Sequence, residues 1–446
     1  MNLSAMLSSR IQNNRPVRVG LIGAGKFGSM ILSQARHING LHIMAVADLD
    51  LNKAQDSFQR VGWDTKSCFA GSAAEAVISG KTWLTDNAAD ICALSELDCI
   101  IEATGHPLFG VRHAMMALQQ AKHVVMVNVE ADVLCGPYLT QLADENNVIF
   151  SMAYGDQPAA ICELVDWART NGFELISAGK GMNFQPHFRY STPDTVWSYF
   201  GWSDEEVAAG DFNPKMYNSF TDGTKAAIEM AAVANATGLD CPDDGLAFYP
   251  AGLHDLARVF TPESAGGRLP KAGLLDIAAS CEPDGRSVYN NINYGMFVTF
   301  KAPNEYSRDC FKQYGLLTDK SGWYGSMWRP FHLIGLETNT SVMSAVLRHE
   351  ATGASRIWNA DAVATAKRDL DAGEMLDGEG GFTIYSGVRP AAMSVANRYL
   401  PLGLANHVKL LRPVKKDQPI TLDDVDIETT STAYKLREKT IAMLAR

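Results

Sequence analysis

The chain has 446 residues, about three times the length of a typical single domain, which predicts two or three domains. Hydrophobic residues make up 46% and charged residues 20% of the sequence, a globular composition that excludes the disordered, collagen-like and coiled-coil classes. Basic residues number 39 and acidic residues 50, so the formal net charge is −11. Because this charge repels phosphate groups, we expect neither nucleic acid nor a membrane surface as a partner.

The sequence shows no sign of a membrane or secretory protein. No apolar run reaches the roughly 18 residues that a membrane helix needs, and the N-terminus lacks the charged and apolar regions of a signal peptide. The eight cysteines show no C-x-x-C spacing and mostly lie in apolar stretches, which indicates reduced thiols. We therefore expect a cytoplasmic protein.

Strands and helices alternate in the first part of the chain. Continuous apolar runs predict strands at 17–22, 41–47, 97–101, 123–127 and 148–151, and helical spacing predicts helices at 27–36 and 111–120. Parallel strands that are buried on both faces give apolar runs of this kind. The sequence thus predicts an α/β fold, a Rossmann-type doubly wound parallel sheet, over residues 1–155.

The rest of the chain has a different pattern. A helix at 159–169, a strand at 173–178, an Ala-rich helix at 224–237 and a strand at 288–300 predict an α+β domain for catalysis and dimerisation over residues 156–350. Short strands punctuated by Gly and Pro then predict a small β-rich domain over residues 351–446.

A glycine pattern, G-A-G-K-F-G at 23–28, follows the first predicted strand and begins the first predicted helix. In that position the three glycines of a dinucleotide-binding fingerprint allow a tight turn, approach of the backbone to pyrophosphate, and close packing of helix on strand. An acidic residue closes the second strand twenty residues later, where it can accept hydrogen bonds from a ribose. We expect contacts to the coenzyme from Gly23, Gly25, Lys26, Phe27, Gly28 and Asp48.

The acidic residue Asp48 favours NAD, because the 2′-phosphate of NADP needs a nearby cation. Lys26, Lys53 and Arg60 are the candidates for that cation. From the residues alone, both coenzymes stay open, with a slight preference for NAD.

Two later strand ends carry polar residues at the edge where open sheets bind ligands. The segment E-A-T-G-H at 102–106 predicts that Ala103, Thr104 and Gly105 lie along the nicotinamide ribose, although an ordinary strand-to-helix loop would look the same. Asn128-Val129-Glu130 ends the next strand, so Glu130 is either a catalytic acid at this rim or an exposed loop residue.

The predicted catalytic domain contains two further candidates. Lys180 follows a strand between Gly179 and Gly181, so its ammonium could polarise a substrate carbonyl or bind a phosphate; a surface lysine in a turn is the alternative. Asp222 and Lys225 lie three residues apart at the start of the Ala-rich helix. They could share proton transfer, unless Asp222 is simply the helix cap.

A polar and aromatic segment around residues 324–337 holds two candidate substrate ligands. Arg329 could bind a phosphate or carboxylate with its planar fork, and His332 could titrate near neutral pH. A buried structural Arg and His would fit the same segment.

Several of these segments together resemble homoserine dehydrogenase. The turn at 23–28, Asn128, Lys180 and the helix with Asp222 and Lys225 follow one another in that order over roughly residues 16–240. Homoserine dehydrogenases usually have Asn-Lys where this chain has Asn128-Val129-Glu130, and their catalytic acid and lysine are four residues apart rather than three. These departures imply a different substrate.

Over nearly the whole length the chain resembles the 1-deoxy-D-xylulose 5-phosphate reductoisomerase-like enzymes, a branch related to homoserine dehydrogenase. The segment W-R-P-F-H at 328–332 and a C-terminal stretch similar to a SAF-type module carry this resemblance. It implies NADPH-dependent conversion of the phosphosugar 1-deoxy-D-xylulose 5-phosphate to 2-C-methyl-D-erythritol 4-phosphate, the first committed step of the methylerythritol phosphate route to isoprenoids. It also implies a homodimer and a divalent cation, Mg or Mn, with ligands that the sequence does not identify.

Two alternatives stay open. One is a homoserine-dehydrogenase-like NAD(P)-dependent oxidoreductase that acts on another sugar-derived or amino-acid-like alcohol. The other is a sensor without catalytic activity, in which the first domain reports the state of the coenzyme through the C-terminal domain.

Overall fold

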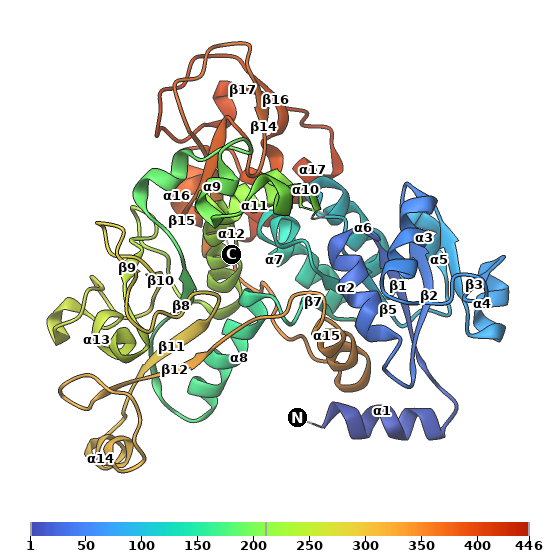
Figure 1. Cartoon of the computed structure of the whole chain (residues 1–446), viewed down its shortest axis with the longest axis horizontal. Helices are drawn as coiled ribbons and strands as arrows, with labels where there is room; N and C mark the ends of the chain where they lie inside the picture. Colours follow the sequence, from blue (N-terminus) through green and yellow to red (C-terminus); the bar gives the residue numbers. More distant parts are fainter. Residues whose placement is uncertain (1, 210–211, 445–446) are drawn as a thin grey trace. The chain divides into compact units, whose positions relative to one another are not determined.

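The computed structural model describes residues 2–209 and 212–444 (Figure 1). The chain forms two compact units, and each unit is built from separate segments. The first comprises Met1–Ala160, Leu333–Arg356 and Leu436–Thr440, and the second comprises Ile161–His332, Ile357–Lys435 and Ile441–Arg446. The sequence predicted boundaries near residues 155 and 350, whereas the chain returns to the first unit between these two points and again near its end. Among the described residues, no helix combines the length and the apolar character needed to cross a lipid bilayer.

The first unit contains a seven-stranded parallel sheet in the order β3-β4-β2-β1-β5-β6-β7. The strand order reverses between β1 and β5, which lie next to each other, so this is the point where doubly wound sheets bind their ligands. The predicted doubly wound sheet is therefore confirmed. The strands are β1 (Val17–Ile22), β2 (Leu41–Ala47), β3 (Phe69–Ala70), β4 (Thr82–Thr85), β5 (Cys99–Glu102), β6 (His123–Met126) and β7 (Phe150–Met152).

The helices of this unit pack in two groups: α2 against α3, and α6 against both α5 and α7. Asx and Ser side chains begin several of them, since Asp50, Ser72, Asn87 and Asn128 each accept hydrogen bonds from backbone N–H groups of the first turn. The helices are α2 (Lys26–Ala35), α3 (Leu51–Arg60), α4 (Ala73–Ser79), α5 (Ala88–Ala93), α6 (Pro107–Gln119) and α7 (Val129–Glu145).

Two segments distant in sequence complete the core of the first unit. Helix α1 (Leu3–Gln12) contributes Leu7, and α15 (Asn339–Met343), which continues into a π-helical turn at η4 (Ser344–Arg348), contributes Val342. Just before α15, Gly335 has φ +78°, and a Cβ added there would lie 2.5 Å from the Cβ of Met30 in α2. Only glycine allows the returning segment to pass this close to α2.

The second unit contains a five-stranded mixed sheet in the order β12-β11-β8-β10-β9. Strand β10 runs parallel to β8 and β9, and β11 runs antiparallel to β8 and β12. The predicted α+β character is confirmed, although the strand predicted at 288–300 is confined to β11. The strands are β8 (Glu174–Met182), β9 (Tyr249–Pro250), β10 (Leu274–Ala279), β11 (Met296–Lys301) and β12 (Tyr324–Arg329).

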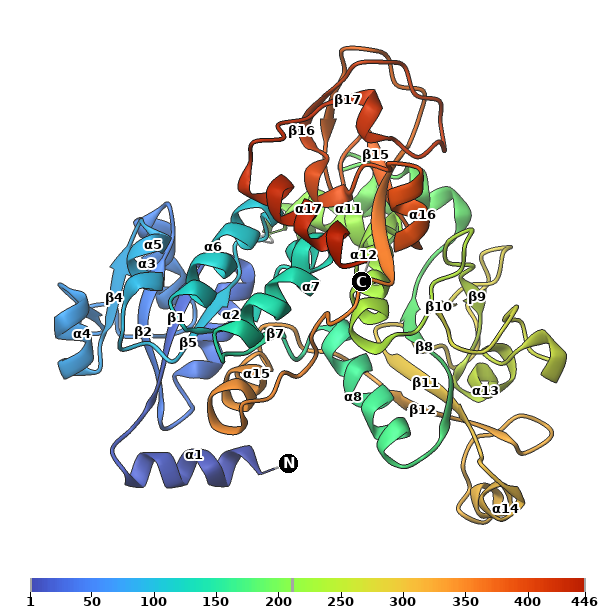
Figure 2. The same cartoon turned by 180° about the vertical axis from the view of Figure 1, so that it is seen from behind.

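Helix α12 (Thr224–Thr237) is the centre of the second unit. It packs against β10 and against the C-terminal strands β13 (Ala360–Ala366) and β15 (Ile384–Pro390), and both views show it beside β15 (Figures 1 and 2). Twelve of its residues are buried, which explains why the helix consists largely of alanine and other small residues. The remaining helices of this unit are α8 (Gln157–Thr170), which begins in the first unit, α9 (Val196–Phe200), α10 (Asp204–Ala209), α11 (Pro214–Thr221), α13 (Leu256–Val259), α14 (Glu305–Gln313) and α16 (Ala391–Ala396).

The C-terminal segment is β-rich, as the sequence predicted. Strands β13 and β15 pair antiparallel, and β14 (Met375–Asp377), β16 (Asn406–Leu410) and β17 (Val425–Asp426) form a three-stranded sheet. Helix α17 (Thr432–Met443) ends the described chain. Because β13 and β15 pack on α12, residues 357–435 belong to the same compact unit as the mixed sheet.

A single buried side chain joins α12 to the start of β13. The Asn235 amide oxygen accepts hydrogen bonds from the backbone N–H groups of Asn359 and Ala360, and its amide nitrogen donates to the Ala360 carbonyl at 3.1 Å. The Asn235 side chain therefore satisfies three backbone groups at the point where the C-terminal strands begin.

We predict that Asn235→Ala lowers the free energy of unfolding by about 3 kcal/mol, because it leaves buried backbone groups without partners. Urea denaturation followed by circular dichroism measures this change. The control is Asn397→Ala, since Asn397 is exposed and bonds only the Met393 carbonyl within its own helix turn; the expected change is below about 0.5 kcal/mol. Equal effects of the two substitutions would contradict the linking role of Asn235.

Candidate functional site

The turn between β1 and α2 has the glycine geometry of a dinucleotide site. Gly23 has φ +96°, and a Cβ there would lie 2.7 Å from the Ala103 carbonyl carbon. A Cβ at Gly28 would overlap the carbonyl oxygen of Gly23. At Gly25 nothing lies within 4 Å of an added Cβ, so this residue faces open space. Two glycines are thus required by packing, and the third leaves room for a ligand.

The start of α2 supplies the electrostatic part of this site. Gly25 is the N-cap residue, and the amides of the first turn, including those of Phe27 and Gly28, have no intrahelical acceptors by the geometry of a helix. They lie next to the open space at Gly25, where the helix dipole favours negative charge. A diphosphate fits this position in both space and charge.

Asp48 lies at the end of β2 and holds the glycine turn. Its Oδ2 accepts a hydrogen bond of 2.8 Å from the Ala24 N–H, and its Oδ1 accepts one of 3.0 Å from the Asp50 N–H. Lys53 lies in the first turn of α3, whereas Arg60 is the last residue of that helix, about 10 Å further along its axis. Lys53 therefore stays a candidate for contacting a 2′-phosphate, as does Lys26 at the start of α2, and Arg60 does not.

The other predicted coenzyme residues follow β5, beside the glycine turn. The backbone of Ala103 and Thr104 touches Gly23, and Gly105 has φ +70° with open space around its Cβ position. Behind them, Glu102 is fully buried. Its Oε1 accepts a hydrogen bond of 2.5 Å from the Thr104 hydroxyl and lies 3.2 Å from His113 Nδ1. Glu102 and His113 thus fix the loop, a role that the sequence analysis did not assign to them.

Glu130 is placed at the same edge of the sheet. It lies in the first turn of α7, directly after β6, and is only 7% exposed. The Asn128 side chain caps this helix by accepting a hydrogen bond of 3.1 Å from the Ala131 N–H. Glu130 is therefore a buried residue at a helix N-terminus, where a carboxylate is favoured, rather than an exposed loop residue.

In the second unit, Lys180 lies near the C-terminal end of β8 and forms a buried ion pair with Glu229 of α12. The two side chains are 8% and 5% exposed. Glu229 was not predicted from the sequence, although an acid within a largely apolar, Ala-rich helix is a signal that could have found it, because such an acid needs a buried partner. The alternative of a surface lysine in a turn is wrong.

Packing, rather than access of a ligand to Lys180, explains why the residues on either side of Lys180 are glycines. A Cβ at Gly179 would overlap the Asp276 carbonyl oxygen, and a Cβ at Gly181 would overlap the Ile292 carbonyl oxygen. Both glycines point to the sheet face opposite Lys180, since neighbouring residues of a strand alternate. They admit backbone on that face and do not open a path to the lysine.

Arg329 and His332 belong to the same side of the sheet as Lys180. Met296 of β11 pairs with Lys180 on one side and with Arg329 on the other, so these three side chains point to one face, with Arg329 about 10 Å from Lys180 across two strands. His332 lies 2.9 Å from the Tyr294 carbonyl oxygen. Burial lowers its pKa, and the positive charges of Lys180 and Arg329 act in the same direction. The structure therefore brings together Lys180, Glu229, Arg329 and His332.

The expected pair of Asp222 and Lys225 is wrong. Asp222 follows α11 directly, and its side chain accepts a 2.8 Å hydrogen bond from the Thr224 N–H at the start of α12. Its carboxylate forms a buried ion pair of 2.8 Å with Lys367, whereas the Lys225 ammonium lies 4.0 Å from Glu379. The two residues are not on one helix, because the left-handed Gly223 separates α11 from α12. Burial raises the pKa of Asp222, and Lys367 opposes that effect.

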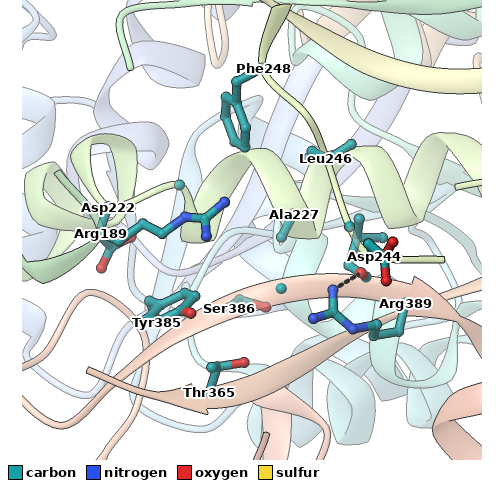
Figure 3. Close-up of a pocket in the computed structure, with 14 residues that line it drawn as sticks. Arg189, Asp222, Ala227, Asp244, Leu246, Phe248, Thr365, Tyr385, Ser386 and Arg389 are labelled. Carbon is teal, nitrogen blue, oxygen red and sulfur yellow. Dashed lines mark hydrogen bonds between the residues drawn. The ribbon is translucent and has the colours of Figure 1, made fainter. Parts of the chain in front are cut away.

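Asp222 lines a cavity on the side of α12 that faces β15 (Figure 3). Ala227 of α12 also lines it, and Glu229, two positions further, is rotated by about 200° from Ala227 around the helix. Asp222 and Lys180 thus lie on different sides of α12. Both residues were predicted to be catalytic, and the fold separates them.

The implied divalent cation does not fit the residues present. Within the described parts of the chain there is no group of three or more His, Cys, Asp or Glu side chains that could hold a metal ion. The buried Asp222 carboxylate already has Lys367 as its partner.

Comparison with known proteins identifies a class of enzyme. Residues 155–338 match the model of a family described as oxidoreductase DRL, catalytic domain. No curated protein matches the chain. The expectation of an oxidoreductase is therefore confirmed at the level of class.

Solved structures resemble the chain only distantly. A biliverdin reductase from Synechocystis sp. PCC 6803, solved with biliverdin and NADP+, is 16% identical, with 38% of this chain and 48% of that chain covered and a TM-score of 0.27. This chain thus spans about half the length of that reductase. A probable dehydrogenase from Thermotoga maritima is 13% identical, with 75% of this chain and 90% of that chain covered and a TM-score of 0.38. For apo scyllo-inositol dehydrogenase from Lactobacillus casei the identity is 13%, the coverage 77% and 91%, and the TM-score 0.37. TM-scores this low give these likenesses no weight for the activity of this chain.

The family expected from the sequence motifs is wrong. The matching model is that of oxidoreductase DRL, not that of homoserine dehydrogenase or of the 1-deoxy-D-xylulose 5-phosphate reductoisomerase-like enzymes. The reductoisomerase activity, the place in isoprenoid synthesis and the SAF-type module rested on that resemblance and find no support. The motifs that carried it are short, and the structure gives several of them other reasons, such as the packing of Gly179 and Gly181.

We predict that breaking the Asp222–Lys367 pair destabilises the second unit. Asp222→Asn or Lys367→Met alone should lower the free energy of unfolding by about 3 to 5 kcal/mol, because each leaves a buried charge without its partner. The double variant should lose less than the sum of the two. Lys225→Met is the control, with an expected loss below about 1 kcal/mol. Additive losses in urea denaturation would show that the pair is not coupled.

Proposed function

We propose that the chain is an NAD(P)-dependent oxidoreductase that interconverts a hydroxyl and a carbonyl group on a small polar molecule. The observation that carries this proposal is the open space at Gly25, which faces the first turn of α2 beside the point where the strand order reverses. The match of residues 155–338 to the catalytic domain of an oxidoreductase supports it independently.

The residues of the first unit fit a nicotinamide dinucleotide. The amides at the start of α2 would hold the diphosphate, and the Asp48 carboxylate would accept hydrogen bonds from a ribose. The loop from Ala103 to Gly105 would line the nicotinamide side, held in place by Glu102. When bound, the coenzyme supplies or accepts the hydride.

The residues of the second unit provide proton transfer. In the reductive direction the Lys180 ammonium donates a proton to the carbonyl oxygen of the substrate, and in the oxidative direction the neutral amine takes the proton of the hydroxyl. Glu229 positions Nζ and balances its charge. Arg329 and His332, on the same side of the sheet, would bind polar or anionic groups of the substrate.

The substrate belongs to the class of sugar-derived or amino-acid-like alcohols, with phosphosugars among them. A homodimer, which the sequence analysis expected, stays a prediction. A sensor without catalytic activity is the second candidate, and it would bind coenzyme without turning over any member of this class.

We predict that the double substitution Lys180→Met, Glu229→Gln lowers kcat by a factor of about 10² to 10⁴ with little change in coenzyme affinity, because it removes the proton donor without leaving a buried carboxylate unpaired. Oxidation of NADPH and NADH is followed with a panel of phosphosugars, sugar acids and keto acids. Gly25→Val should instead abolish coenzyme binding in fluorescence titration, since its side chain fills the space for the diphosphate. Coenzyme binding without turnover across the panel would favour the sensor. Full activity of the double variant would contradict the role of Lys180 as the proton donor.

The choice of coenzyme provides a further prediction. Lys53→Ala should raise the KM for NADPH about tenfold and leave the KM for NADH unchanged, because the lysine would contact only the 2′-phosphate. Arg60→Ala is the matched control on the same helix and should change neither value. If Lys53→Ala affects both coenzymes equally, the lysine does not select between them.

A further inference from the structure

The cavity beside α12 is a second place in the second unit that is built to hold a ligand. It contains about 420 Å³ of space outside the atoms, with open solvent at its mouth included. Its walls come from the start of α12, from the loop that contains Leu246 and Phe248, and from β15. Figure 3 shows two arginine side chains, Arg189 and Arg389, reaching toward it from different sides.

Among the described residues, the Arg189 guanidinium lies against two aromatic rings. Its guanidinium carbon lies 5.7 Å from the ring centroid of Phe184 and 5.8 Å from that of Tyr385. In the described part of the chain, no carboxylate lies within ion-pair distance of it. The aromatic faces hold the guanidinium in place and leave its N–H donors available.

The N–H donors of Arg389 are not taken up by an acidic side chain of the described residues either. Its Nη1 donates a hydrogen bond of 2.8 Å to the Val388 carbonyl, and it too forms no ion pair within the residues that the structure describes. Arg389 follows Tyr385 by four positions on β15, a separation of about 13 Å along the strand. The two guanidinium groups therefore belong to different ends of the cavity.

A buried hydroxyl also lacks a partner here. Thr365 lines the cavity and is 2% exposed, and its Oγ1 has no hydrogen-bond partner. A buried hydroxyl without a partner costs free energy, so a ligand that bonds to it recovers that cost. Thr365 is thus an observation independent of the two arginines.

The acidic residues of the cavity do not cancel this positive charge. The Asp222 carboxylate is already neutralised by Lys367. Asp244 is exposed and lies at the Arg389 end in Figure 3, so it reduces the charge at that end only in part. Leu246, Phe248 and Val388 provide apolar wall between the two ends.

We propose that this cavity binds a small dianion with one anionic group at each end, such as a dicarboxylate or a phosphorylated carboxylic acid. Arg189 binds one end, Arg389 binds the other, and Thr365 donates a hydrogen bond to the ligand. This site lies across α12 from Lys180 and Glu229, so its ligand and the substrate of the oxidoreductase bind at different places. The site does not depend on the proposed activity.

Calorimetric titration of the full chain, without coenzyme, tests the proposal. The probes are glutarate, with two carboxylates, 3-phosphoglycerate, with one carboxylate and one phosphate, and acetate and inorganic phosphate as ligands with a single anionic group. Glutarate or 3-phosphoglycerate should bind at least about ten times more tightly than acetate and inorganic phosphate. Whichever of the two binds more tightly shows whether the cavity prefers two carboxylates or a carboxylate and a phosphate. Equal affinities for all four probes would overturn the proposal.

Substitutions locate the binding. Arg189→Gln and Arg389→Gln should each reduce the affinity for the preferred dianion at least tenfold, to the level of the single-group probes. Arg368→Gln is the matched control in the same unit, because Arg368 is exposed and paired with Glu374; it should change nothing. Asp244→Asn should increase the affinity, which tests the site with a variant that removes a charge from the surface only.

Two further variants separate this proposal from the proposed oxidoreductase activity. Thr365→Val keeps the shape of the side chain and should weaken binding without a change in turnover. The double variant Lys180→Met, Glu229→Gln should lower kcat by a factor of about 10² to 10⁴ and leave the affinity for the dianion unchanged. Loss of dianion binding in this variant, with its urea denaturation midpoint unchanged, would show that the cavity is part of the substrate site and would overturn the assignment of a separate site.

Discussion

The second unit depends on the neutralisation of two buried acids at one helix. Asp222 precedes α12 and Glu229 lies within it, and each is paired with a lysine from another part of the chain, Lys367 after β13 and Lys180 in β8. A carboxylate removed from water without a partner costs several kcal/mol, so each acid requires its lysine to be in place. The two pairs thereby fix the mixed sheet and the C-terminal strands to opposite sides of the same helix. An apolar helix alone would provide packing, but not this specific arrangement.

The same arrangement places two candidate sites in the unit rather than one. Successive residues of α12 point around its axis, so a helix that is buried on all sides presents one set of side chains to β8 and another to β15. On the β8 side lies the Lys180–Glu229 ion pair, and Arg329 and His332 belong to the same sheet face. This set of groups suits proton transfer. On the β15 side the lysine and acid balance each other, and two arginines remain without acids, which suits an anion. The chemistry of each site follows from the charged side chains that lie beside the neutralised buried acids.

The sequence predicted the first unit well and the second less well, for a physical reason. Strands β1, β2, β5 and β6 are buried on both faces, so their apolar runs are continuous, and the glycine turn after β1 has a short local sequence pattern. Short elements between residues 69 and 93 were missed, since strands of two to four residues leave no periodic signal. Helix α1 was missed as well, because its contact with the core arises only in the folded chain. Lys180, Arg329 and His332 were found as residues, but their common sheet face follows from strand register, which the sequence does not show.

The errors in the second unit all come from applying a local rule to a tertiary contact. The spacing of Asp222 and Lys225 suggested one helical face, yet a left-handed glycine at Gly223 divides the segment into two helices. Glycines beside Lys180 suggested ligand access, yet they admit the carbonyl groups of neighbouring segments. At Gly25 in the first unit the space beside the backbone is open, so a ligand has room there. The difference between a structural glycine and a ligand-binding glycine therefore lies in what occupies the position of its absent Cβ, and this is a property of the fold rather than of the motif.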